Sequence, residues 1–311
     1  MEALLDAAKP TTGHEAEPRQ PRVRIHALRA IPHAIRMRQW SKNLLLFAGV
    51  VFAAKLGDVG KVAEAVVAFA CYCAASSASY LLNDVRDASH DRLHPVKRLR
   101  PVASGVLPER TALLVAGVLV AAALALAATL GWWSLAALAG FVALQLGYSL
   151  ALKHVVLIDV MAIAALFVVR AAAGAVAVHV RISPWLLLCS ALLALFLGLA
   201  KRRGELVLVG AEVTRGRPVL EGYSLELVDQ LLSVVAASTV ISYALYTFNA
   251  RTQAMMLTIP FVLFGIFRYL LLVHQHDLGE EPERVLLSDR AILACVALWI
   301  AASAVVLGAV A

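Results

Sequence analysis

The sequence predicts an all-α integral membrane protein, a bundle of nine transmembrane helices with charged helical loops at one end. Of its 311 residues, 61% are hydrophobic and only 16% are charged, and the mean hydropathy is +0.80. Soluble domains average roughly 45–50% apolar and about 25% charged residues. The apolar residues are grouped into runs of about 20, the length that crosses a bilayer as a helix. These two observations favour a multi-pass membrane protein.

Nine apolar runs are expected to span the membrane. They cover residues 38–55, 62–82, 109–130, 132–152, 155–177, 184–201, 226–247, 252–273 and 289–310. The first run is the weakest, because Arg38 and Lys42 stand at its start. Residues 22–311 are expected to form one domain. Residues 1–21 are polar and lack periodicity, so they are predicted to be a disordered tail without a cleavable signal peptide.

The distribution of charge predicts which side of the membrane each loop faces. The formal net charge is +7 and the sequence pI is about 9.4, which in a membrane protein indicates cytoplasmic Lys and Arg and no nucleic-acid partner. Basic residues gather in the N-terminal flank and after the second, fourth and sixth runs. Nine spans place all four segments on one side, so this side is predicted to be the cytoplasm and the C-terminus is expected outside. The expected location is the plasma membrane.

The cysteines give no sign of redox or metal chemistry. All four lie inside apolar runs, and they are Cys71, Cys73, Cys189 and Cys295. Cys71 and Cys73 are two residues apart, so on a helix they face different sides. Their spacing fits neither a disulfide framework nor a zinc site. We expect them to be small packing residues.

The segment between the second and third runs is the most informative part of the chain. Residues 83–101 read N-D-V-R-D-A-S-H-D-R-L-H-P-V-K-R-L-R-P. Asp84, Asp87 and Asp91 are spaced i, i+3 and i+7, so on a helix their carboxylates share one face. Such a face repels itself unless a cation lies between the carboxylates, and hard oxygen ligands suit Mg²⁺. We therefore expect a Mg²⁺ site made by these aspartates with Asn83, open to phosphate oxygens.

Basic residues near the aspartates indicate that the expected ligand carries phosphate groups. Lys97, Arg98 and Arg100 follow the motif directly and would donate charged hydrogen bonds to phosphate. Further basic residues expected on the same cytoplasmic rim are Lys42, Lys153, Lys201 and Arg202. The alternative is an ordinary solvated loop between two spans. For Lys153 the simpler alternative is a basic residue at a cytoplasmic helix end.

A second polar cluster lies at the junction of the fourth and fifth runs, where Tyr148, Lys153 and Asp159 occur. Arg170 follows Asp159 by eleven residues, three helical turns further along the same face. Burying a charged side chain at that depth in the membrane costs free energy, so we take Arg170 as a candidate functional residue. Its alternative is a structural ion pair inside the bundle, with Asp159 or with Glu205.

Taken together, these motifs resemble the UbiA superfamily of intramembrane prenyltransferases. The resemblance rests on nine helices, on N-D-x-x-D-x-x-x-D after the second run and on the Tyr/Lys/Asp cluster after the fourth, and it covers nearly the whole chain after the tail. Other strings resemble the branch of this superfamily that transfers phosphoribose. They are R-M-R-Q-W-S-K-N (36–43), N-D-V-R-D…D-R-L-H-P-V-K-R-L-R-P (83–101), L-K-H (152–154), K-R-x-x-E-L (201–206) and F-R-Y (267–269).

One departure from the superfamily pattern concerns the second aspartate-rich motif, which many members carry after the fourth span. Only Asp159 is present here, and it is followed by Val160, Met161, Ala162 and Ile163. A second metal site with two carboxylates is therefore not expected. This reduction agrees with the phosphoribosyl branch, whose second motif is also reduced.

The resemblance implies a Mg²⁺-dependent enzyme that transfers 5-phosphoribose from 5-phosphoribosyl 1-diphosphate (PRPP) to decaprenyl or another polyprenyl phosphate. Diphosphate would leave, and the product would supply arabinan synthesis in an actinobacterial cell wall. The cytoplasmic helical loops would cap the active site, and a homotrimer is implied. The catalytic residues implied are Asp84, Asp87, Asp91 and Asp159. The substrate-binding residues implied are Lys42, Asn83, Lys97, Arg98, Arg100, Tyr148, Lys153, Arg170, Lys201 and Arg202.

Within this picture Asp159 is expected to face the mouth of the site, where it would contact ribose hydroxyls or a second Mg²⁺, and Arg170 is expected to point into the bundle. Two other functions stay open. One is a prenyltransferase that moves an isoprenyl group onto an aromatic or other small acceptor, with the same fold and first motif. The other is a transporter, although no pair of interrupted helices occurs in matching halves.

Overall fold

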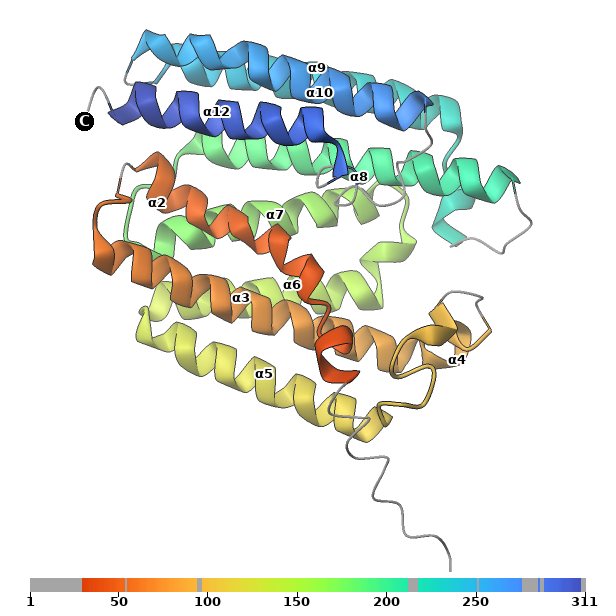
Figure 1. Cartoon of the computed structure of the whole chain (residues 1–311). Helices are drawn as coiled ribbons and strands as arrows, with labels where there is room; N and C mark the ends of the chain where they lie inside the picture. The colour runs from red at the N-terminus through yellow and green to blue at the C-terminus, as the bar shows by residue number, and fades with distance from the viewer. Residues whose placement is uncertain are drawn as a thin grey trace, which may run out of the picture.

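The computed structural model describes residues 30–53, 55–93, 97–211, 218–250, 252–275, 285 and 288–308. All regular structure within these residues is helical. Seven of the described helices are long and apolar enough to cross a membrane. The tail predicted at residues 1–21 lies outside the described residues. The prediction of an all-helical membrane bundle is confirmed (Figure 1).

The long helices follow the predicted apolar runs. They are α3 (Val59–Arg86), α5 (Glu109–Thr129), α6 (Trp132–Leu150), α7 (Ile158–Ala177), α8 (Pro184–Ala211), α9 (Leu225–Phe248), α10 (Ile259–Gln275) and α12 (Arg290–Gly308). Shorter pieces connect them, and these are α2 (Ala48–Phe52), α4 (Ala88–Asp91) and the 3₁₀ helices η1 (Met37–Phe47), η2 (Lys97–Leu99), η3 (Leu152–His154), η4 (Pro218–Gly222) and η5 (Gln253–Thr258). Within the residues that the structure describes, the apolar stretch of α12 is shorter than those of the seven candidate spans.

The first predicted span is not a continuous α-helix. Residues 37–47 form the 3₁₀ helix η1, and the short α-helix α2 follows it. A 3₁₀ helix has three residues per turn, so Trp40, Asn43 and Leu46 stand in one row. This row faces the bundle: the Trp40 indole donates to Ser77 Oγ at 3.0 Å, and Asn43 Nδ2 contacts Cys73 Sγ at 3.3 Å. The tighter helix therefore aligns polar side chains with α3.

The helix of the sixth predicted run extends beyond the expected residues 184–201. Helix α8 continues through the K-R-R-G-E-L string to Ala211. The charged side chains remain on the helix because they have partners on neighbouring helices. Arg202 Nε donates to Asp159 Oδ2 on α7 at 2.6 Å, and Arg203 Nε donates to Asp229 Oδ1 on α9 at 2.8 Å.

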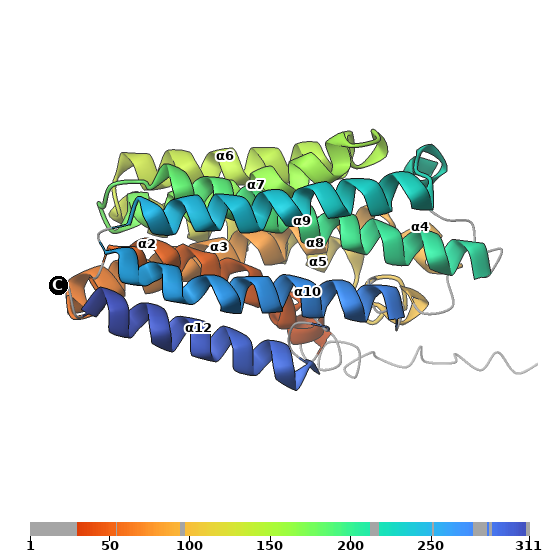
Figure 2. The same cartoon turned by 90° about the horizontal axis from the view of Figure 1, so that it is seen from above.

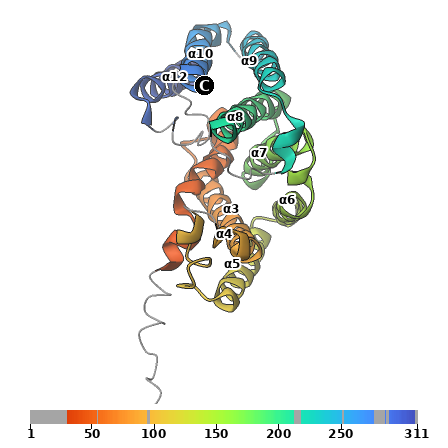
Figure 3. The ribbon, with the colours of Figure 1, turned by 90° about the vertical axis from the view of Figure 1, so that its right-hand side faces the viewer.

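Two main hydrophobic cores hold the bundle together. The first contains side chains of η1, α3, α5, α6 and α7, with Tyr72, Leu138 and Phe141 at its centre. The second contains side chains of α7, α8, α9, α10 and α12, with Phe196 and Tyr269 at its centre. Figure 3 shows α3 and α5 in one part of the end-on view and α9, α10 and α12 in the other, with α7 and α8 between them. Helix α7 contributes to both cores.

The two long polar connections lie at the same end of the bundle. Figure 1 shows α4 and the C-terminal end of α8 together at the right-hand end, whereas α12 ends at the left, and the view from above agrees (Figure 2). The segments after α3 and after α8 are those that the charge pattern placed on one side. The shared end is where the candidate site lies.

A close backbone contact fixes η1 against α7. A Cβ atom placed on Gly174 would lie 2.1 Å from the carbonyl oxygen of Leu46. On the other side of the contact, a Cβ on Gly49 would lie 2.8 Å from Ala175 Cα. Glycine at both positions lets the two backbones approach each other directly, and no larger residue fits without moving one of them.

Candidate active site

The three aspartates of residues 84–91 stand at a break between two helices. Helix α3 ends at Arg86, and Asp87 has φ −90° and ψ 3°, outside the helical range, before α4 begins at Ala88. The sequence predicted one continuous helical face. The carboxylates contact different cations in the structure: Asp84 and Asp91 contact Arg100, whereas Asp87 contacts Lys153.

Asp84 and Asp91 converge on one cationic side chain. Arg100 Nη1 lies 2.6 Å from Asp91 Oδ2 and 3.3 Å from Asp84 Oδ1. A second guanidinium, that of Arg36, donates to the same Asp84 oxygen at 2.5 Å. Both carboxylates are buried, whereas the two arginine side chains are each 29% exposed. The two arginine side chains therefore reach solvent, whereas the carboxylates lie beneath them.

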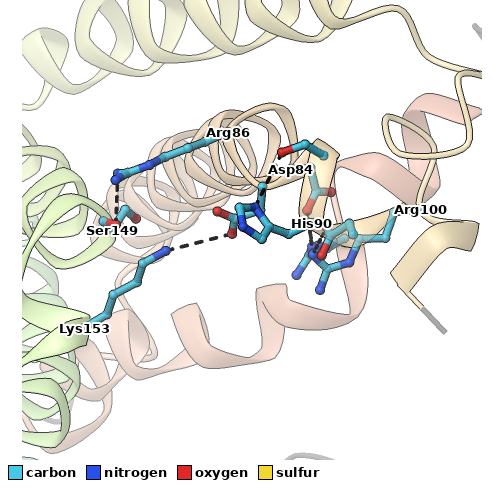
Figure 4. A network of polar contacts seen from close by, with 10 residues as sticks. Asp84, Arg86, His90, Arg100, Ser149 and Lys153 are labelled. Atoms are coloured by element: carbon cyan, nitrogen blue, oxygen red, sulfur yellow. Dashed lines mark hydrogen bonds and ion pairs between the residues drawn. The ribbon is translucent and has the colours of Figure 1, made fainter. Parts of the chain in front are cut away.

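Asp87 faces the junction of α6 and α7. Lys153 Nζ on η3 lies 3.9 Å from Asp87 Oδ2, and Arg86 Nη1 donates to the carbonyl oxygen of Ser149 at 3.1 Å. Figure 4 shows Lys153 and Arg86 crossing the space between these elements from opposite sides. The first contact places Lys153 beside Asp87, one of the three predicted aspartates.

The oxygen ligands around Asp84 fit a Mg²⁺ ion whose coordination is completed by a bound substrate. Within the described ranges no three carboxylate, histidine or cysteine side chains converge as a closed metal site. Two carboxylates already meet at the position of Arg100 Nη1, however, and the neighbouring Asn83 is half-buried. Mg²⁺ is usually bound through one or two carboxylates together with substrate phosphates and water. Asp84 and Asp91 supply that number.

Asp159 does not offer a second metal site. It is 0% exposed, and both carboxylate oxygens have donors: Oδ2 accepts from Arg202, and Oδ1 accepts from the Tyr223 hydroxyl at 2.7 Å. Arg202 is itself 1% exposed and bonds through Nη1 to Glu205. Asp159 was expected to face the mouth of the site. It instead ties α7 to α8 and to the segment before α9.

Arg170 lies deep in the first core, as its position on α7 predicted. Its Nε donates to Asn43 Oδ1 at 2.8 Å and its Nη1 to the carbonyl oxygen of Leu166 at 3.1 Å. The guanidinium carbon lies 4.7 Å from the Phe141 ring centroid and 5.2 Å from that of Phe167. The alternative of an ion pair with Asp159 or Glu205 is wrong, because both carboxylates bind Arg202.

A family model matches most of the chain. Residues 44–289 match the UbiA prenyltransferase family, which is more than half of the sequence.

The chain belongs to the UbiA prenyltransferase family.

Curated relatives of this UbiA protein are similar over most of their length. A decaprenyl-phosphate phosphoribosyltransferase of Mycolicibacterium smegmatis is 36% identical over 288 residues, which cover 86% of this chain and 89% of the relative. Another, from Corynebacterium glutamicum, is 34% identical over 278 residues, which cover 86% of this chain and 83% of that protein. These relatives are transferases of the same family.

Solved structures support the fold. A UbiA homolog from Archaeoglobus fulgidus bound to GPP and Mg²⁺ has a TM-score of 0.68 at 20% sequence identity, and the match covers 90% of this chain and 99% of that one. A structure of digeranylgeranylglyceryl phosphate synthase has a TM-score of 0.66 at 17% identity. Identities this low show the fold alone. The seven apolar helices, together with membership of the UbiA family, indicate a multi-pass membrane protein.

The remaining predicted site residues of this UbiA protein differ in exposure. Arg98 on η2 is exposed to solvent. The half-buried ones are Lys42 on η1, Lys97 on η2, Tyr148 on α6 and Lys201 on α8. Sequence reasoning missed Arg36, Asn43 and Tyr223 as partners of the site. Arg36 and Asn43 lie within the R-M-R-Q-W-S-K-N string, so the resemblance pointed to them, whereas nothing local singled out Tyr223.

Tyr223 connects two loops at the site. Its hydroxyl donates to Asp159 and accepts from the backbone N–H of Leu157 at 2.7 Å. Leu157 has a φ of 66°, a conformation that leucine rarely adopts. Burial raises the pKa of the Tyr223 phenol, so the hydroxyl stays a neutral donor. The tyrosine thereby holds the strained turn of residues 151–157 against α7.

Tyr223→Phe should lower the free energy of unfolding by about 2 kcal/mol, because it leaves a buried carboxylate oxygen and a backbone N–H without this partner. The measurement is thermal unfolding in detergent by intrinsic fluorescence. Tyr246→Phe is the control, since Tyr246 contacts Phe52 and Tyr243 only through its ring. Equal melting temperatures for Tyr223→Phe and wild type would show that the hydroxyl does not hold the turn.

Proposed function

We propose that this protein transfers 5-phosphoribose from PRPP to a polyprenyl phosphate, such as decaprenyl phosphate, and releases diphosphate. The observation that carries the proposal is the similarity to decaprenyl-phosphate phosphoribosyltransferases at 34–36% identity over nearly their whole length. The site supports the same chemistry, because carboxylates for a metal and cations for phosphate meet at one end of the bundle. The product would serve arabinan synthesis in the cell wall.

The metal in this proposal is Mg²⁺. Asp84 and Asp91 would hold it with Asn83, and Asp87 would contribute from the adjacent turn. A structural neighbour was solved with Mg²⁺, which supports this choice. When bound, the ion neutralises the negative charge that accumulates on departing diphosphate. Arg36 and Arg100, which now balance the two carboxylates, are then available to bind phosphate oxygens.

In this proposal the phosphate groups of the substrates are bound mainly by cationic side chains. Lys153 lies beside Asp87 and can reach a phosphate bound at the aspartates, and Arg100 lies on the opposite side of the same space. The acceptor phosphate is anionic before it attacks the anomeric carbon, so the reaction requires no strong general base. Inversion at that carbon is the expected outcome of a direct attack.

We infer that the active site faces the cytoplasm of a plasma-membrane protein whose chain crosses the bilayer nine times. Seven helices meet the length of a span. The 3₁₀ helix η1 rises about 2.0 Å per residue, so η1 and α2 together extend roughly 30 Å, close to the thickness of the apolar layer. Helix α12 would supply the ninth crossing. The basic segments then lie on the cytoplasmic side with the loops over the site.

Purified protein in detergent should convert labelled PRPP and decaprenyl phosphate to a lipid-linked phosphoribose with equimolar diphosphate. A chelator should remove this turnover and added Mg²⁺ should restore it, because the carboxylate pair needs a metal to bind diphosphate. Geranyl diphosphate with an aromatic acceptor is the comparison. Transfer of the prenyl group, without any phosphoribosyl transfer, would contradict the proposal and favour ordinary prenyltransferase activity.

A further inference from the structure

A row of polar side chains runs along α3 from the aspartates into the apolar core. Tyr80, Ser76 and Tyr72 follow Asp84 inward at intervals of four residues, so each side chain neighbours the next one along the helix. Tyr80 begins the row beneath Arg36, whose guanidinium carbon lies 5.0 Å from the Tyr80 ring centroid. The site at Asp84 is therefore continuous with polar groups deeper in the bundle.

Three polar atoms at the inner end of this row lack partners. Tyr72 Oη, Ser76 Oγ and Gln145 Oε1 are fully buried and have no hydrogen bond within the described part of the chain. Tyr72 and Gln145 both lie near Phe141, whose ring is 4.8 Å from that of Tyr72 and which is one turn from Gln145 on α6. Ser76 is one turn from Tyr72 on α3. Buried polar groups are normally paired, and an unpaired one destabilises the fold. Three such groups on the facing sides of α3 and α6 indicate that something polar satisfies them.

Arg170 adds a cation to the same place. Its guanidinium carbon lies 4.7 Å from the centroid of the Phe141 ring, which also packs against the Tyr72 ring. Its hydrogen bonds to Asn43 and to the Leu166 carbonyl involve neutral acceptors, and no carboxylate in the described ranges pairs with it. A buried cation without an anion is costly. The natural partner for this group is an anion that also accepts hydrogen bonds from hydroxyl groups.

We propose that these residues form the subsite for the sugar-phosphate end of the donor. The 5-phosphate accepts from Arg170, Tyr72 and Ser76, and a ribose hydroxyl donates to Gln145. The identity of the donor rests on the proposed function. Ser76 is eight residues from Asp84, about 12 Å along the helix, which leaves room for a ribose between diphosphate at Asp84 and phosphate at Arg170.

The same residues discriminate between two kinds of donor. A prenyl diphosphate places an apolar chain beyond its diphosphate, and such a chain cannot pair with Arg170, Ser76 or Gln145. The polar groups then stay unsatisfied, and the binding of that donor is weakened. The cluster thus selects a phosphoribosyl donor within a fold whose structural neighbours bind prenyl diphosphates.

Ser76→Ala and Gln145→Leu test this subsite without removing the buried charge. Each should raise the KM for PRPP by roughly five- to tenfold, as expected for one lost hydrogen bond to a charged or sugar group. The melting temperature should equal or exceed that of wild type, because an unpaired polar group is removed. Ser79→Ala is the matched control on α3, since its hydroxyl already bonds to the Ala75 carbonyl at 3.1 Å. It should keep the wild-type KM.

Inhibition by fragments of PRPP shows which part of the donor each variant binds less well. In wild type, both ribose 5-phosphate and diphosphate should inhibit; in Ser76→Ala and Gln145→Leu, inhibition by ribose 5-phosphate should weaken while that by diphosphate is unchanged. If both variants behave like Ser79→Ala in a protein that turns over PRPP, the polar atoms hold buried water and the inference is wrong. If wild type transfers no phosphoribose, the proposed function itself fails.

Discussion

Asp84→Asn is expected to reduce phosphoribosyl transfer by about a thousandfold, the scale seen when one preorganised electrostatic group is removed from an active site. The physical reason is the convergence of Asp84 and Asp91 on one cationic position, where each carboxylate supplies half of the charge that would hold Mg²⁺. The fold should survive, because Arg36 and Arg100 are partly exposed and water can solvate them after the loss of Asp84. Steady-state kinetics and binding of Mn²⁺ by calorimetry measure the two effects.

Glu109→Gln is the matched control for this variant. Glu109 pairs with Arg92 at 3.2 Å near the start of α5, in the same connecting region, and both side chains are about half exposed. An exposed pair contributes little to stability, so this variant should keep wild-type turnover and metal affinity. Near-normal Mg²⁺-dependent turnover by Asp84→Asn would show that the metal is held elsewhere.

Gly174→Ala is expected to destabilise the bundle by at least about 3 kcal/mol, or to prevent its folding, because overpacking of this severity exceeds what side-chain adjustment absorbs. The added methyl group would lie 2.1 Å from the Leu46 carbonyl oxygen, and the clashing atom belongs to the backbone. Helix α7 and η1 must therefore separate, which also stretches the Arg170–Asn43 hydrogen bond. Thermal unfolding in detergent and the yield of monodisperse protein measure the loss.

Gly140→Ala on α6 separates this effect from the general effect of alanine. No atom lies within 4 Å of the position that its Cβ would take. Alanine favours a helix over glycine by about 1 kcal/mol, so this variant should be as stable as wild type or more stable. Equal stability of the Gly174 and Gly140 variants would mean that the contact between η1 and α7 relaxes without cost.

The sequence predicted the parts of this protein that depend on local patterns. Hydropathy located the helices, because a span must satisfy its backbone internally and expose apolar side chains to lipid. The spacing of Asp84, Asp87 and Asp91 led to the prediction of a cation site, and the structure brings Asp84 and Asp91 together at Arg100. The basic residues of the connecting segments predicted which ends of the helices lie together, and the structure has them at one end.

The features that the sequence did not reveal depend on partners far along the chain. Residues 37–47 are a 3₁₀ helix because one row of their side chains matches α3, and no local preference encodes that match. Asp159 was predicted as part of the mouth of the site, since a carboxylate at a cytoplasmic helix end normally faces water. Its burial follows from Tyr223, which is 64 residues away, and from Arg202 on an unexpectedly long α8.

The contact of η1 with α7 joins two segments of the bundle that the ribosome synthesises at different times. Asn43 and Arg170 are 127 residues apart, and chains are synthesised at roughly 5–20 residues per second. The N-terminal segment therefore enters the membrane on the order of ten seconds before Arg170 and Gly174 exist. During this interval Asn43 and the carbonyl of Leu46 lack their final neighbours. The final packing of η1 in the bundle therefore forms only after α7 has been synthesised and inserted.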